Sequence, residues 1–313
     1  MADIRRITLS SDQHYGRRLP PQAGLAIAAL PFVIRCAVSM AFRQRSSMPG
    51  RKPKWFKAVT DIRFVGHEGD DNTDLLFEVP LFGESAKELY DKPEFWPTKP
   101  DPCDTGFEVF GDVLADVISD NRDSDRFDRP LLKHIVNLRR VLNRGFREIE
   151  VGSERQRAGP LPRINPTVIE TAKGFYRTTP DPRRIRLYGV LDMVRASTQG
   201  FGLKMQSGEE ARGVLAAGDV CDLQGLLNQP VTVFGVAVYR PSGRLLRIDA
   251  DEVIPATDKD KFFAKVPHGL PPRGNIHRTI QEQAHKRGIA AIIGKWPGDE
   301  TDEQIEEALR RLS

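Results

Sequence analysis

Long apolar runs and short alternating runs divide the chain into a mixed first half and a strand-rich second half. The longest apolar run, 24–42, has about the 20-residue length that spans a bilayer, but it contains Pro31 and Arg35. A central arginine costs about 2.5–3.5 kcal/mol on insertion scales. We therefore predict a buried core helix from which Arg35 leaves the core, with a membrane span as the alternative.

The remaining elements of the first half follow from shorter patterns. Thr105-x-x-Glu108 is a capping box, which predicts a helix start. The apolar positions after it recur at helical spacing, up to Val117 and Ile118. The other elements expected before residue 180 are strands at 58–65, 74–79 and 147–151 and helices at 129–144 and 165–178.

From residue 183 the pattern changes to short alternating strands separated by glycine-containing turns. The order is one strand interrupted by Gly189, the segment GFGLKMQSGEEARGVL with two strands, a short helix at 219–228 and two final strands. This order over 183–256, with Gly189, the Gly235-Val236 pair and Ile254, resembles an OB-fold barrel. The resemblance implies a five-stranded Greek-key barrel with a helix after the third strand.

These patterns predict an α+β protein. An N-terminal α+β domain at 1–160 is followed by an OB-like β-barrel at 180–256. A C-terminal extension at 257–313 ends in an amphipathic helix.

The OB resemblance also implies a binding surface, since many such barrels hold single-stranded nucleic acid on strands 2 and 3 and the flanking loops, although others bind only proteins. The residues expected to contact nucleic acid are Tyr188, Arg195, Lys204, Arg212, Tyr239, Arg240 and Arg244. Stacking is worth about 1–3 kcal/mol per base, so the two tyrosines would matter most. Phe201 shares a face with Leu203 and is expected in the core. With nine basic and eight acidic residues the barrel is nearly neutral, which argues against strong autonomous binding.

Charge is distributed in opposite blocks. Residues 1–57 carry eleven lysines and arginines against two aspartates, whereas residues 101–125 carry eight acidic residues and one arginine. The basic block favours contacts to phosphates. Pairing between the two blocks is the alternative.

The tail has a sequence pattern of its own. Thr301-x-x-Gln304 is a capping box, and the apolar stripe after it predicts an amphipathic helix that docks either on its own chain or on a partner. The segment WPGDETDEQIEEALRRL resembles the C-terminus of bacterial antitoxin-like proteins paired with PIN-domain ribonucleases. The resemblance implies a nuclease-type partner contacted through Trp296, Asp299, Glu300, Ile305 and Leu309.

Catalytic motifs are absent from the sequence: it has no phosphate-loop, nucleophile-elbow, HExxH or CxxC pattern. Asp112, Asp116 and Asp120 lie on one helix face and would suit a hard cation, but a solvated face has the same spacing. His277 and His285 lack a shared helix for metal binding, and Cys103 has no histidine nearby in sequence.

We therefore expect a non-catalytic binding protein that needs no cofactor and no membrane. Three unpaired cysteines and the lack of an apolar leader favour a cytosolic location. The expected role is the antitoxin or regulatory component of a bacterial toxin–antitoxin or defence pair. The alternatives are an OB-type nucleic-acid-binding protein without a toxin partner and a metal-dependent enzyme that uses the aspartate cluster.

Overall fold

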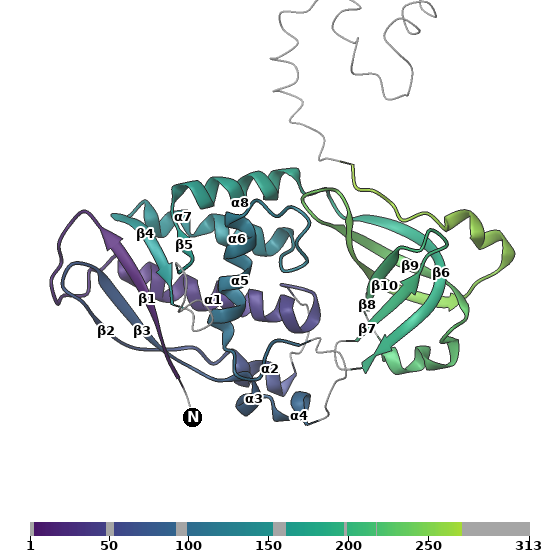
Figure 1. Ribbon diagram of the computed structural model, residues 1–313, viewed down its shortest axis with the longest axis horizontal. Coiled ribbons are helices and arrows are strands. Elements are labelled where there is room, and N and C mark those ends of the chain that lie inside the picture. The colour runs from purple at the N-terminus through teal and green to yellow at the C-terminus, as the bar shows by residue number, and fades with distance from the viewer. Residues whose placement is uncertain are drawn as a thin grey trace, which may run out of the picture. The chain divides into compact units, whose positions relative to one another are not determined.

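The computed structural model describes residues 3–47, 53–91, 99–152, 161–196, 199–216 and 218–270. They belong to one compact unit, Met1–Leu270. Helices, an open sheet and a closed barrel are all present, so the α+β class is confirmed (Figure 1). The finer domain boundaries at 160 and 180 stay a prediction.

The first half contains a five-stranded sheet in the order β2-β3-β1-β4-β5, with every neighbouring pair antiparallel. Its strands are β1 (Asp3–Ser11), β2 (Arg63–Glu68), β3 (Thr73–Val79), β4 (Phe146–Val151) and β5 (Arg163–Ile164). Alternate residues of β3, from Thr73 to Val79, are buried, so one face of the sheet contributes to the core. That core is shared with the surrounding helices.

The longest helix, α1 (Ala23–Arg43), confirms the predicted core helix. Eleven of its residues, mostly apolar, are buried, and Arg35 is exposed as expected. Among the described residues, α1 is the one helix with the length and hydropathy to cross a membrane, but its apolar side chains pack into the protein core. The packing therefore supports a core helix over a membrane span.

The other helices begin at recognisable caps. Thr105 and Glu108 form the expected capping box at the start of α5 (Gly106–Ile118). Asp128 caps α6 (Arg129–Asn137), and Asn165 caps α8 (Pro166–Thr178). The shorter helices are α2 (Lys54–Val59), α3 (Phe82–Ser85), α4 (Lys87–Tyr90) and α7 (Arg139–Leu142).

Three predictions in this half need correction. The strand expected at 58–65 is wrong in its first part, because Phe56 and Val59 are buried three residues apart on helix α2 and the strand begins at Arg63. The helix expected at 129–144 is divided into α6 and α7 at Leu138. The central strand β1 is an element that the sequence pattern does not predict, and it lies within the basic block at 1–57.

The second half is a closed barrel of β6 (Arg183–Arg195), β7 (Gly200–Lys204), β8 (Glu210–Leu215), β9 (Pro230–Tyr239) and β10 (Leu245–Pro255). Its strand order is β10-β8-β7-β6-β9, and β9 closes the ring on β10. Strands β8 and β10 pair in parallel, and the 3-10 helix η3 (Val220–Leu226) connects β8 to β9. This architecture is compatible with an OB-like barrel.

Two further features of the barrel are a close approach between two strands and a 3-10 helix that contacts its outside. Gly235 allows β9 to approach β10 closely, because a Cβ at this position would lie 2.4 Å from the carbonyl oxygen of Asp249. The 3-10 helix η4 (Asp258–Phe263) contacts the barrel through Arg186, whose guanidinium lies 4.9 Å from the ring centroid of Phe234 and 4.7 Å from that of Phe263. The amphipathic helix expected near the C-terminus lies outside the described residues.

Candidate functional site

The outward face of β7 and β8 carries charged side chains. Along these strands Phe201, Leu203 and Ala211 are buried in the barrel, whereas Lys204 and Arg212 are exposed. The expectation that Phe201 belongs to the core is confirmed. A cavity of about 380 Å³ opens beside this face, lined by Gln44, Asp192, Met193, Arg195, Gly200, Phe201, Gly202, Leu203, Glu210, Arg212 and Gly213.

The two tyrosines expected to stack on bases are both buried. Tyr188 is 7% exposed and Tyr239 is 2% exposed. Burial also raises the pKa of Tyr239. In this conformation neither ring offers the open face that stacking requires, and stacking on these tyrosines stays a prediction.

The other predicted contacts do not form one cluster. Arg195 and Lys204 end β6 and β7, and because these strands are antiparallel the two residues lie at opposite ends of the paired segment. Arg212, Arg240 and Arg244 gather where β8 and the β9–β10 turn meet the loop at 119–128. Arg240 is the least accessible of these three: burial lowers its pKa, and the carboxylates of Asp125 and Asp123 oppose that shift.

The loop at 119–128 follows α5 and contacts the barrel through its carboxylates. Asp125 lies 3.2 Å from the Arg212 guanidinium, and Asp123 lies 3.7 Å from that of Arg244. The Ser242 hydroxyl donates to Asp123 at 2.6 Å, and the Ser242 amide donates to the Arg122 carbonyl at 3.3 Å. We call this set of exposed contacts the acidic clamp.

The shape of this loop depends on Asp116, one member of the aspartate stripe. Its carboxylate accepts hydrogen bonds from Ser124 Oγ at 2.6 Å and from Arg126 at 2.9 Å, and Asn121 donates at 3.4 Å. Asp120 instead pairs with Arg122. Among the described residues no group of three or more potential ligands is placed to hold a metal ion, so the stripe is not assembled as a cation site.

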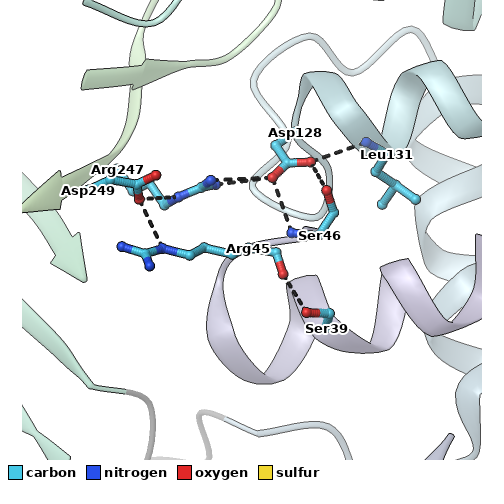
Figure 2. A network of polar contacts seen from close by, with 7 residues as sticks. All are labelled: Ser39, Arg45, Ser46, Asp128, Leu131, Arg247 and Asp249. Atoms are coloured by element: carbon cyan, nitrogen blue, oxygen red, sulfur yellow. Dashed lines mark hydrogen bonds and ion pairs between the residues drawn. The ribbon is translucent and has the colours of Figure 1, made fainter. Parts of the chain in front are cut away.

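A second contact between the barrel and the helices is buried. The Arg247 guanidinium donates to Asp128 at 3.3 Å and to Asp249 at 2.9 Å (Figure 2). Asp249 also accepts from Arg45 at 3.1 Å. Asp128 accepts from the Ser46 amide and hydroxyl as well, besides capping α6 through Leu131. We call this network, formed by Arg45, Ser46, Asp128, Arg247 and Asp249, the buried anchor.

The anchor and the clamp border a second cavity of about 440 Å³. It is lined by Ala37, Met40, Ala41, Gln44, Lys99, Pro100, Val109, Asp112, Val113, Asp125, Arg126, Arg212, Leu246 and Arg247. Gln44 and Arg212 line both cavities, so the two adjoin. Burial raises the pKa of Asp112 here, and Arg126 opposes the shift. The lining mixes apolar side chains with charges of both signs.

The basic N-terminal block has several partners. Arg5 forms a buried pair with Glu108 of the acidic block, as the pairing alternative expects. Arg6 pairs instead with acidic residues of β2 and β3, and Arg45 belongs to the anchor. Arg17 remains highly exposed. The basic block is thus only partly neutralised by the acidic one.

Several predicted residues lie outside the described part of the chain. These are the partner-binding residues Trp296, Asp299, Glu300, Ile305 and Leu309, together with His277 and His285. Cys103 is an exposed free thiol.

Sequence reasoning missed the anchor, although part of its signal was readable. An aspartate directly before Arg-Pro is typical of a helix N-cap, and this identifies Asp128 as a cap. Its partner Arg247 lies 119 residues away and carries no local signal. The chain matches no protein-family model, no curated protein and no solved structure.

Proposed function

We propose that this chain is a non-catalytic binding protein whose barrel contacts single-stranded nucleic acid through the open face of β7 and β8. The observation that carries the proposal is that Arg195 and Arg212 line one cavity on a closed five-stranded barrel, while Lys204 is exposed on the same strand pair β7–β8. OB-like barrels hold nucleic acid on the corresponding face.

The chemistry of this face favours the backbone of the strand over its bases. Guanidinium and ammonium groups bind phosphates and release condensed counterions, so affinity falls steeply with salt. Because Tyr188 and Tyr239 are buried, base stacking on them adds nothing in this conformation. The proposed binding is therefore sequence-tolerant and governed by phosphate contacts.

The test is fluorescence anisotropy of the full chain with labelled oligo(dT) and oligo(U) of about 16 nucleotides, the upper site size of an OB fold. Titrations at about 50 and about 200 mM salt give the salt dependence. We expect Arg195→Ala/Lys204→Ala to weaken binding about tenfold and to make the salt dependence shallower, because two phosphate contacts are lost.

Arg17→Ala/Arg18→Ala is the matched control, since it removes the same charge from two exposed residues of the basic N-terminal block. Equal weakening of binding by both variants would mean that overall charge explains the effect. Stronger weakening by the control would mean that the nucleic acid contacts the N-terminal block instead of the β7–β8 face. Absence of binding by the wild type and both variants would end the proposal.

The regulatory role in a nuclease pair is a separate proposal that rests on the sequence of the tail. Its test is capture of partners from native cell extract by the intact chain and by a chain lacking 295–313, followed by mass spectrometry. A ribonuclease lost together with the tail supports the role. A ribonuclease retained without the tail, or none captured by either chain, contradicts it.

A further inference from the structure

Three arginines of the barrel converge on one loop of the helical part. Arg212 and Arg244 form ion pairs with Asp125 and Asp123 in the acidic clamp. The carboxylates of Asp125 and Asp123 also favour the charged form of Arg240, whose Nε is buried without a hydrogen-bond partner. The loop thus presents carboxylates to three residues that the sequence predicts to bind phosphates.

Contacts within the helical part hold the loop in shape, and none of them involves Arg212, Arg240 or Arg244 of the barrel. The Asp116 carboxylate ties the loop together through Ser124 and Arg126. At its end Phe127 is fully buried and stacks on Phe175 of α8, with ring centroids 5.7 Å apart. Folding of the helical part therefore positions the carboxylates of Asp123 and Asp125 before any partner is present.

We propose that Arg212, Arg240 and Arg244 form a phosphate-binding surface that the carboxylates of Asp123 and Asp125 occupy as an internal substitute for a polyanion. The inference rests on the proposed function and extends it. The nucleic acid would continue from the β7–β8 face onto this surface and displace the loop from it. The loop then competes with the nucleic acid for the three arginines and lowers the affinity of the protein for nucleic acid.

Exposure makes this displacement feasible. The side chains of Arg212 and Asp125 are 49% and 54% exposed, and those of Arg244 and Asp123 are 63% and 49% exposed. Exposed ion pairs contribute little and are screened by salt, so phosphates can replace the carboxylates at small cost. The buried anchor meanwhile keeps the barrel attached, because the side chains of Arg247 and Asp128 are only 7% and 1% exposed.

The experiment compares the wild type with Asp123→Asn/Asp125→Asn in the same anisotropy assay with oligo(dT). Asparagine still accepts the Ser242 hydrogen bond but removes the competing charge. We expect the variant to bind about three- to tenfold more tightly, since the exposed pairs no longer have to be broken. We also expect a steeper salt dependence, by roughly 0.7 in the logarithmic slope for each arginine released.

Asp70→Asn/Asp71→Asn is the matched control. It raises the net charge equally at two exposed aspartates that contact Arg17 and His14 instead of the barrel. Equal tightening by both variants would overturn the inference, because overall charge would explain it. In a background of Arg212→Ala/Arg244→Ala, Asp123→Asn/Asp125→Asn must bring no gain in affinity, and a gain that persists in this background would also overturn the inference.

The outcomes separate this inference from the proposed function. If the wild type binds through Arg195 and Lys204 but the clamp variant binds no more tightly, the inference fails and the proposed function stands. If the clamp variant gains affinity that does not depend on Arg195 and Lys204, the inference stands and the β7–β8 face is the wrong surface. If no variant binds, both fail.

Discussion

Two polar contacts between the barrel and the helical part use the same residue types in opposite environments. In the buried anchor, Arg247 meets Asp128 where neither side chain is more than 7% exposed. In the acidic clamp, Arg212 and Arg244 meet aspartates whose side chains are about half exposed. A charge that loses its partner is costly when buried and nearly free when solvated. The buried anchor is therefore suited to stabilising the fold. The exposed clamp is suited to exchanging its carboxylates for another anion.

The largest predicted effect comes from breaking the anchor. Arg247→Met leaves the Asp128 carboxylate buried without its opposing charge, which costs about 3–5 kcal/mol of unfolding free energy. Urea denaturation at neutral pH measures the loss. Adding Asp128→Asn should recover part of it, because the asparagine amide carries no charge and its oxygen can still cap α6. A loss below about 1 kcal/mol for Arg247→Met would contradict the structural role of the anchor.

The next effect concerns strand β8, which takes part in both contacts. Its Arg212 belongs to the clamp, and its Val214 carbonyl accepts from Arg45 of the anchor at 3.0 Å. Gly213 between them lies under the Phe201 ring, where an added Cβ would come within 2.1 Å of a ring carbon.

We expect Gly213→Ala to cost about 1–3 kcal/mol of unfolding free energy through overpacking, again measured in urea. Gly202→Ala is the control on the neighbouring strand, because its Cβ would meet Met193 at an ordinary 3.4 Å. If both substitutions cost the same, the close packing of Phe201 on Gly213 is not what fixes β8.

A smaller effect is expected from the clamp. Asp123→Asn/Asp125→Asn should lower the unfolding free energy by less than about 1 kcal/mol, since both ion pairs are exposed. Urea denaturation of this variant and of Arg247→Met under the same conditions compares the two contacts directly. A loss as large as that from Arg247→Met would mean that the clamp also holds the fold.

The smallest effect is expected from removing the tail. Met1–Leu270 forms a compact unit by itself, so deletion of 295–313 should change the melting temperature by no more than about 3 °C. Differential scanning calorimetry of the two chains measures the shift. A much larger destabilisation would favour docking of the tail on its own chain, the alternative to a partner-binding role.

Most of the fold was predictable because its signals are local. The apolar run of α1, the capping box of α5 and the alternation in the barrel strands each lie within a few neighbouring residues. The start of the strand expected at 58–65 was less predictable, because the β-branched residues Val59, Thr60 and Ile62 favour strands, whereas Val59 ends helix α2 and β2 begins only at Arg63.

The site was less predictable because its contacts are long-range. Arg212 and Arg244 were identified as basic residues, but their partners lie 87 and 121 positions away on a loop shaped by Asp116. The spacing of Asp112, Asp116 and Asp120 suggested a shared role, whereas Asp116 organises the loop and Asp120 pairs with Arg122. The burial of Tyr188 and Tyr239 is a property of the tertiary structure, which strand periodicity does not report.

Hydrogen exchange of the intact chain, with and without oligo(dT), tests most directly whether nucleic acid opens the contacts of the clamp and leaves those of the anchor intact. The Ser242 amide, bonded to the Arg122 carbonyl at 3.3 Å, reports on the clamp, and the Leu131 amide, bonded to Asp128 at 3.2 Å, reports on the anchor. The account predicts slower exchange in β7 and β8, faster exchange at Ser242 and unchanged exchange at Leu131 on addition of the oligonucleotide. Slower or unchanged exchange at Ser242, or faster exchange at both amides, would contradict it.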